Sequence, residues 1–105
     1  GPNKQSILDG VPKSMPALAA AQSMKARASR ANLFNEQEGF PLERIVGLFN
    51  AEEGSGNSRI MEQNVGEALF LLVAKADDLG IDAEGALREA NERFRLKITD
   101  IERKG

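Results

Sequence analysis

Apolar residues recur three and four positions apart along most of the chain, and this spacing places them on one face of an α-helix. The pattern predicts a long helix over about 59–79 and a second that begins after Asp82. The apolar row of this second helix consists of Leu87, Ala90, Phe94, Ile98 and Ile101. We expect Phe94 to lie in the core. The sequence shows no alternation of apolar and polar residues of the kind typical of a strand.

Two shorter helices are predicted before these. The first is expected to begin near Ser14 as the N-cap, with Pro16 tolerated in the first turn, and to end near Asn32. A polar connection over 32–41 leads to a short helix over 42–51, which contributes further apolar surface.

Glycine and serine residues mark the remaining boundaries. The run Gly54-Ser55-Gly56-Asn57 breaks the helical pattern, and Ser58 is placed to cap the helix that follows. We interpret the run as a flexible connector, since a phosphate-binding P-loop requires a lysine and a preceding strand. Gly80 is predicted to end the long helix in the left-handed conformation, and Asp82 to cap the next one.

These elements predict an all-α fold, an antiparallel helical bundle of about four helices. Residues 14–105 are expected to form this single domain, and residues 1–13 to be a linker whose Gly1-Pro2 is a remnant of a cleaved tag. Phe70, Leu71 and Leu72 make the long helix apolar most of the way round. A small bundle buries less surface than that, so we expect a homodimer.

Composition narrows the available chemistry. The net charge of −2 gives no general attraction to nucleic acid or to an anionic membrane, and no apolar run approaches the roughly 20 residues that span a bilayer. The chain has no cysteine and no histidine, so catalysis would have to use carboxylates, amines, guanidinium groups or a bound metal ion. No signal peptide is visible, and we expect a cytoplasmic protein.

Three stretches of the chain resemble the second domain of the MazG family of nucleoside triphosphate pyrophosphohydrolases. Residues 8–18 place a basic residue and a serine before Met-Pro-Ala-Leu, where the family has Leu-Pro-Ala-Leu. Residues 65–70, Val-Gly-Glu-Ala-Leu-Phe, are similar to the family's Leu-Gly-Asp-Leu-Leu-Phe. Residues 79–94 resemble its helix-turn-helix and its Asn-x-Lys-Phe pattern, with Arg93 in place of the lysine.

This resemblance implies an all-α fold that works as a dimer or a dimer of dimers. It also implies Mg²⁺-dependent hydrolysis of a nucleoside triphosphate to the monophosphate and pyrophosphate. The family's carboxylates form an E-E-x-x-E motif on one helix and an E-x-x-D motif on the next. Residues three and four apart share a helix face, so the two motifs direct oxygen ligands into one cleft for the metal ions.

The chain departs from the family at these ligands. Asn64 and Glu67 occupy the E-x-x-D positions, which makes Glu67 the candidate metal ligand and Asn64 a weak one. In the preceding helix Glu43 is the only acid between residues 42 and 51. Glu62 and Glu53 are the acids that could substitute from another direction. A site that lacks most of these carboxylates is expected to bind Mg²⁺ poorly.

The resemblance also implies a set of substrate-binding residues: Asn91, Arg93, Lys25, Arg27 and Arg30. The alternative is that the three basic residues form a solvated helix face and that Asn91 bridges two helices. The family's aromatic Gly-Phe-Asp-Trp stretch is replaced here by residues 32–35, and the chain has no tryptophan or tyrosine to stack on a base.

Two functions remain open. One is an active pyrophosphohydrolase whose metal site has drifted, and the other is a non-catalytic dimerisation or regulatory module of a larger MazG protein. Loss of metal ligands removes the electrostatic stabilisation on which phosphoryl transfer relies, so we expect catalysis by this domain alone to be impaired.

Overall fold

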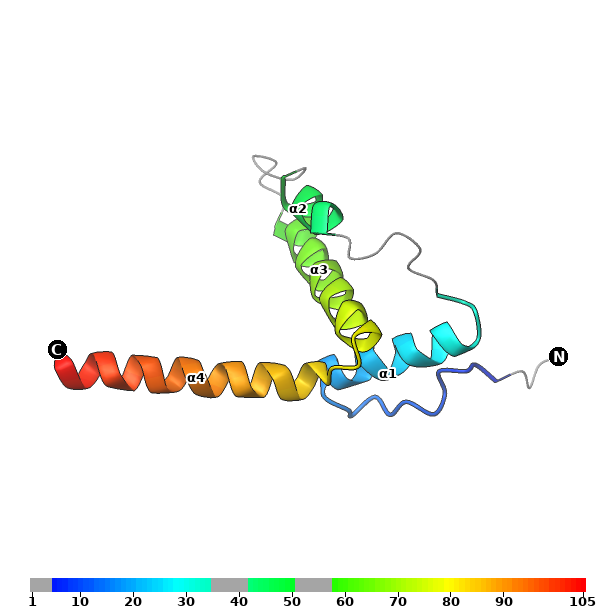
Figure 1. Cartoon of the computed structure of the whole chain (residues 1–105). Coiled ribbons are helices and arrows are strands. Elements are labelled where there is room, and N and C mark those ends of the chain that lie inside the picture. The colour runs from blue at the N-terminus through cyan, green and yellow to red at the C-terminus, as the bar shows by residue number, and fades with distance from the viewer. Residues whose placement is uncertain (1–4, 35–41, 51–57) are drawn as a thin grey trace.

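The protein is all-helical, as predicted. A computed structural model describes residues 5–34, 42–50 and 58–105, and within these ranges every regular element is an α-helix (Figure 1). The elements are α1 (Ala17–Arg30), α2 (Leu42–Asn50), α3 (Ser58–Asp78) and α4 (Ala83–Lys104). Among the described helices none is both long enough and apolar enough to cross a membrane. The prediction of four helices in the all-α class is confirmed.

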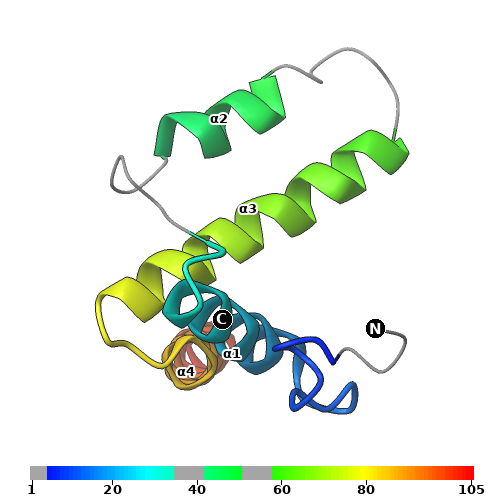
Figure 2. The ribbon, with the colours of Figure 1, turned by 90° about the vertical axis from the view of Figure 1, so that its right-hand side faces the viewer.

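Helix α3 is the centre of the molecule. The short α2 runs antiparallel along the N-terminal half of α3, and α1 packs across its C-terminal half (Figure 2). A tight turn after α3 leads into α4, which contacts α1 and α3 close to its start and then extends away from the other helices (Figure 1). The molecule consequently measures 65 Å along its longest axis but only 34 and 27 Å along the others.

The C-terminal ends of α3 and α1 are both set by the local backbone conformation. Gly80 adopts the left-handed conformation with φ of +72°, and the N–H of Ile81 donates to the carbonyl of Ala76 at 2.8 Å. This is the Schellman arrangement, which satisfies carbonyls left free at a helix end. Asn32 ends α1 in the same conformation, with φ of +59°. The predicted roles of Gly80 and of the region near Asn32 are confirmed.

The predicted start of the first helix is wrong. Helix α1 begins at Ala17 with Pro16 at the N-cap, because the residue before a proline is disfavoured in the helical conformation and Ser14 therefore cannot open the helix. No side chain of the cap satisfies the first amides. Instead the N–H of Ala19 donates to Glu84 Oε1 at 3.3 Å, so an acid from α4 caps α1 across the fold.

The N-terminus of helix α4 is also capped by a side chain from another helix. Asp82 occupies the N-cap as predicted, with an extended backbone, but its side chain makes no capping hydrogen bond. The first amide of the helix, the N–H of Ala83, donates to Gln22 Oε1 at 2.8 Å. Contacts between α1 and α4 therefore replace the local caps that the sequence suggested.

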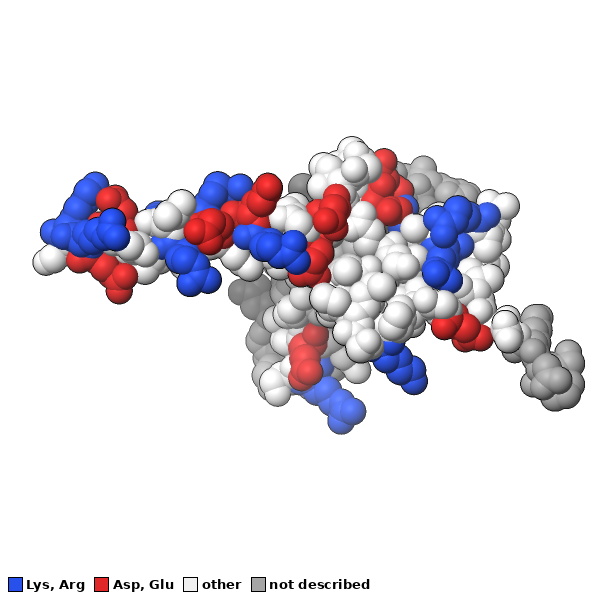
Figure 3. Space-filling model, turned by 90° about the horizontal axis from the view of Figure 1, so that it is seen from below, with Lys and Arg blue, Asp and Glu red and all other residues white. Residues whose placement is uncertain are grey.

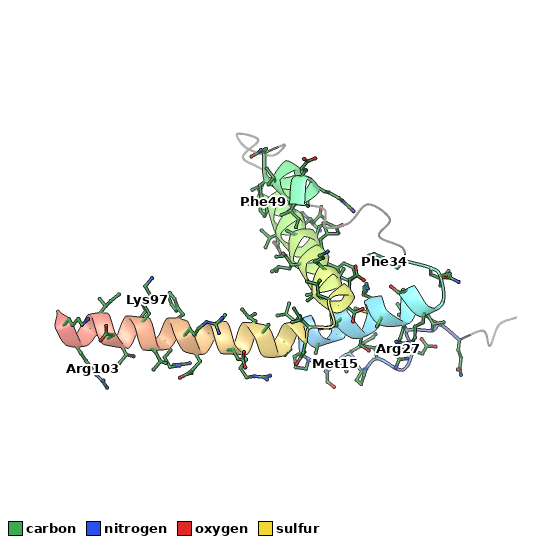
Figure 4. All side chains as sticks on the ribbon, viewed as in Figure 1. Met15, Arg27, Phe34, Phe49, Lys97 and Arg103 are labelled. Carbon is green, nitrogen blue, oxygen red and sulfur yellow. The ribbon has the colours of Figure 1, made fainter. Side chains whose placement is uncertain are left out.

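The core is small. Its buried apolar side chains among the described residues are all on α3: Ala68, Leu71, Val73 and Ala74. At the end of α1, Phe34 packs edge-on against Phe70, with ring centroids 6.1 Å apart (Figure 4). Phe34 lies in the stretch that replaces the family's aromatic motif, and here it packs against α3.

Large apolar side chains remain exposed on α3 and α4. Along α3 an exposed row is formed by Val65, Leu69 and Leu72, with exposed fractions between 44 and 49%, and Leu79 directly after the helix is 60% exposed. On α4 Phe94 is 64% exposed, so the prediction that it lies in the core is wrong for the single chain. Phe94 lies near the middle of α4, and this helix extends away from the other helices (Figure 1).

Candidate functional site

Asn64 and Glu67 lie on the side of α3 that faces α2. Glu67 Oε1 is 2.9 Å from a terminal nitrogen of Arg44, which extends from α2. The side-chain nitrogen of Asn64 donates to the carbonyl of Leu48, also on α2, at 2.7 Å. The two positions that match the family's E-x-x-D motif thus hold the α2–α3 hairpin together.

These contacts fit a divalent metal site poorly. The guanidinium of Arg44 places a positive charge beside one carboxylate oxygen of Glu67, and this charge disfavours a cation at the same oxygen. Asn64 has committed its amide N–H₂ to the backbone, and its neutral oxygen is a weak ligand. Within the described ranges no three acidic, histidine or cysteine side chains come close enough together to hold a metal ion.

Of the two alternative acids the structure places only Glu62, and Glu62 does not complete the site. Glu62 precedes Glu67 by five residues, which places it about 140° away around the helix. It lies instead beside Ser58, Arg59 and Gln63 at an open hollow near the start of α3. Glu53 and the connector Gly54-Ser55-Gly56 lie outside the described residues. The metal requirement of the family is therefore not met by the acids whose positions the structure gives.

Lys25 is the only buried charged residue in the described ranges. Its side chain is 5% exposed, and its ammonium lies 2.9 Å from Asp77 and 2.5 Å from Asp78, the last two residues of α3. Burial alone would lower the pKa of Lys25, but the hydrogen bonds and charges of Asp78 and Asp77 outweigh it, and the pKa is raised above its ordinary value. Lys25 thus joins α1 to the end of α3 as a cation.

Gln22 extends this junction to the following turn. One turn before Lys25 on α1, its side-chain nitrogen donates to the carbonyl of Ile81 at 2.7 Å and lies 3.4 Å from Asp77. Sequence reasoning missed Gln22, Asp77 and Asp78. A signal was present, because two acids in the last turn of a helix oppose the helix dipole and call for a cation.

The other two basic residues of α1 point elsewhere. Arg27 donates to the carbonyl of Ile7 at 3.2 Å, and its guanidinium packs against Gly10, where a Cβ would lie 2.6 Å from it. Arg27 therefore holds the N-terminal segment alongside α1, as Figure 4 shows. Arg30 is exposed in the last turn of α1. The structure does not bring Lys25, Arg27 and Arg30 together around one ligand.

Asn91 and Arg93 lie near the middle of α4 (Ala83–Lys104), the helix that extends away from the other helices (Figure 1). Both side chains are exposed. Helix α4 makes no contact with α2, so these residues are separated from the α2–α3 positions within the single chain. Their assignment to substrate binding stays a prediction, as do those of Lys25, Arg27 and Arg30.

Comparison with known proteins identifies two enzymes similar to this chain. No protein-family model matches the chain. It is similar to the nucleoside triphosphate pyrophosphohydrolases of Escherichia coli strain K12 and Escherichia coli O157:H7, with 30% identity to each across 95% of this chain. The chain spans 40% of the length of these relatives. The resemblance noted in three stretches of the sequence is confirmed, and it extends over nearly the whole chain.

Proposed function

We propose that this chain is a MazG-type helical domain, the second domain of a nucleoside triphosphate pyrophosphohydrolase, in which hydrolysis to monophosphate and pyrophosphate is impaired. The similarity to the Escherichia coli enzymes supports the family. The ion pair between Glu67 and Arg44 supports the impairment most directly, because it occupies the last carboxylate of the metal motif.

The physical argument concerns charge. Bound Mg²⁺ would supply neutralisation of the phosphates and activation of water in this family. Glu67 contributes one negative charge, the nearby guanidinium of Arg44 opposes a second cation there, and Asn64 contributes no charge. Since affinity for Mg²⁺ depends on the number and charge of oxygen ligands, this arrangement favours an empty site at cellular Mg²⁺ concentrations.

Metal titration tests this part of the proposal. Calorimetry with Mg²⁺ or Mn²⁺ should detect no binding tighter than about 1 mM, the range expected for a site with few charged ligands. Glu67→Gln should leave the titration unchanged, and so should the matched variant Glu89→Gln on α4. A micromolar site that is lost in Glu67→Gln and kept in Glu89→Gln would contradict the proposal.

A second role, in assembly or regulation of a larger protein, is favoured by the exposed apolar row on α3. Leu69 and Leu72 are each about half exposed although they lie next to the core residues Ala68 and Leu71. A contiguous apolar row of this kind is typical of an interface between subunits. We therefore propose that the domain is a dimer or a dimer of dimers and that its present role is to assemble the parent protein.

A further inference from the structure

One side of α1 binds the corner at which the chain turns from α3 into α4. This corner comprises the last turn of α3, residues 79–82 and the first turn of α4. Ala19, Gln22 and Lys25 follow one another at intervals of three residues, so they share one side of α1. Together they extend over about 9 Å of helix length. Each of the three bonds to a different part of the corner.

Gln22 binds the turn and the start of α4 at the same time. Its side-chain oxygen accepts from the N–H of Ala83 at 2.8 Å, and its side-chain nitrogen donates to the carbonyl of Ile81 at 2.7 Å. One amide side chain thus holds the backbone on both sides of Asp82. A rotation of the chain at Asp82 would break at least one of these two hydrogen bonds.

Glu84 makes the reciprocal contact from α4 to α1. The N–H of Ala19 donates to Glu84 Oε1 at 3.3 Å. Helices α1 and α4 both begin at the corner and run from it in opposite directions (Figure 1). Their N-terminal ends carry partial positive charge and repel each other. The carboxylate of Glu84 lies in the first turn of α4 and bonds to the first turn of α1, so it stabilises both ends.

Apolar packing restrains α4 only weakly. No residue of α4 is buried, and the helix contacts only α1 and α3 among the described helices. At the corner Leu79 is 60%, Ile81 46% and Leu87 47% exposed. The rest of α4 stands out from the body as an arm, with charges of both signs exposed along it (Figure 3). The polar contacts with α1 are therefore the main restraint on the direction of this helix.

We propose that this side of α1 is a clamp that fixes the direction of α4, and that residues 79–82 act as a hinge when the hydrogen bonds of Gln22 and Glu84 are lost. A hinge consists of a few residues between elements that absorb a change in backbone angles. Gly80 lies among them, and a glycine changes its backbone angles at low cost. The inference depends neither on the metal site nor on self-association.

The third contact of α1 keeps the rest of the molecule together while α4 changes direction. Lys25 pairs with Asp77 and Asp78 on α3, before the hinge, so it joins α1 to α3 whatever the direction of α4. The clamp consequently sets where the exposed side chains of Asn91 and Arg93 on α4 stand relative to the α2–α3 hairpin.

Distances between two spin labels test the clamp. The chain has no cysteine, so labels can be attached at the exposed positions Gln63→Cys on α3 and Lys97→Cys on α4. Dilution of the labelled chain into an excess of unlabelled chain restricts the signal to distances within one chain. Pulsed electron paramagnetic resonance should give one narrow distance distribution. Replacing Gln22 and Glu84 together by alanine should widen this distribution at least about twofold, as expected for a released hinge.

Matched substitutions separate the clamp from a general effect of removing polar side chains. Ser23→Ala on α1 combined with Glu89→Ala on α4 removes two polar side chains from the same two helices and should leave the distribution narrow. Glu84→Gln keeps the oxygen that accepts from Ala19 and should leave it narrow as well. An unchanged width in the double alanine variant at Gln22 and Glu84 would overturn the proposal, and so would equal widening in the matched control.

Circular dichroism checks that the variants remain folded. We expect unchanged helicity, because Asp82 stays at the N-cap of α4 with an extended backbone and can accept the first amides once Gln22 is replaced. If the double variant nevertheless loses helicity, the single variant Glu84→Ala decides, since it removes one contact of a half-buried side chain and keeps Gln22. Its distribution should be wider than that of Glu84→Gln, and equal widths would overturn the proposal.

Discussion

Lys25→Met should lower the free energy of unfolding by about 2–3 kcal/mol, because it leaves Asp77 and Asp78 without their cation. The loss should be smaller than that for a fully buried pair, since Asp77 is 24% and Asp78 46% exposed. Both carboxylates also lie in the last turn of α3, where the helix dipole opposes negative charge. Urea denaturation at neutral pH measures the change.

Lys97→Met on the projecting part of α4 is the matched control, and we expect it to change stability by less than about 0.5 kcal/mol. Figure 4 places Lys97 on α4 beyond the contacts with the body. Equal destabilisation by the two variants would show that the Lys25 ion pairs do not hold α1 to α3.

The stability difference between the original chain and Lys25→Met should depend on pH in a defined direction. The folded-state pKa of Lys25 lies above its ordinary value of 10.5, because the hydrogen bonds and charges of Asp78 and Asp77 outweigh the effect of burial. A raised pKa contributes stability that is complete below the unfolded-state value and is lost as pH rises through the folded-state value. On the alkaline side the difference should therefore fall only as the pH rises above about 10.5.

Leu71→Ala should have a similar or larger effect, about 2–4 kcal/mol, because it opens a cavity in a core of very few side chains. Leu71 is 2% exposed, whereas its neighbour Leu72 is 49% exposed and provides the control Leu72→Ala. Denaturation should be measured at low concentration, so that loss of self-association at Leu72 does not enter the comparison. If the two variants were equally stable, the core would not be where the structure places it.

Much of the fold could be predicted from the sequence because the determining chemistry is local. The periodic apolar positions gave α3 and α4, and Gly80 ended α3 because glycine adopts the left-handed conformation at low cost. The first helix was placed too early because the restriction that Pro16 imposes on the preceding residue outweighs the capping tendency of Ser14.

The remaining errors concern contacts between residues far apart in the sequence. Periodicity identifies the apolar face of α4 but does not say whether that face packs against the rest of the same chain or against another chain. For this reason the prediction that Phe94 lies in the core was wrong for the single chain. The junction of Gln22 and Lys25 with Asp77 joins residues more than 50 positions apart. The only sequence feature that indicated this junction is the pair of adjacent acids at the end of α3.

In the candidate site, too, the local features could be predicted from the sequence and the contacts between helices could not. The replacement of an acid by Asn64 could be seen directly once the family motif was aligned on the sequence. The contacts that now occupy these positions could not, because the register of α2 against α3 decides that Arg44 reaches Glu67 and that Leu48 accepts from Asn64. This register is a property of packing between the two helices.

Impaired hydrolysis is tested most directly by pyrophosphate release from mixed nucleoside triphosphates and Mg²⁺, with full-length Escherichia coli enzyme as the positive control. We predict that the purified chain releases no more pyrophosphate than buffer does, and that Glu67→Gln and the control Glu89→Gln behave identically. Mg²⁺-dependent release that is abolished by Glu67→Gln and retained by Glu89→Gln would contradict the proposal and establish Glu67 as a metal ligand of a working enzyme.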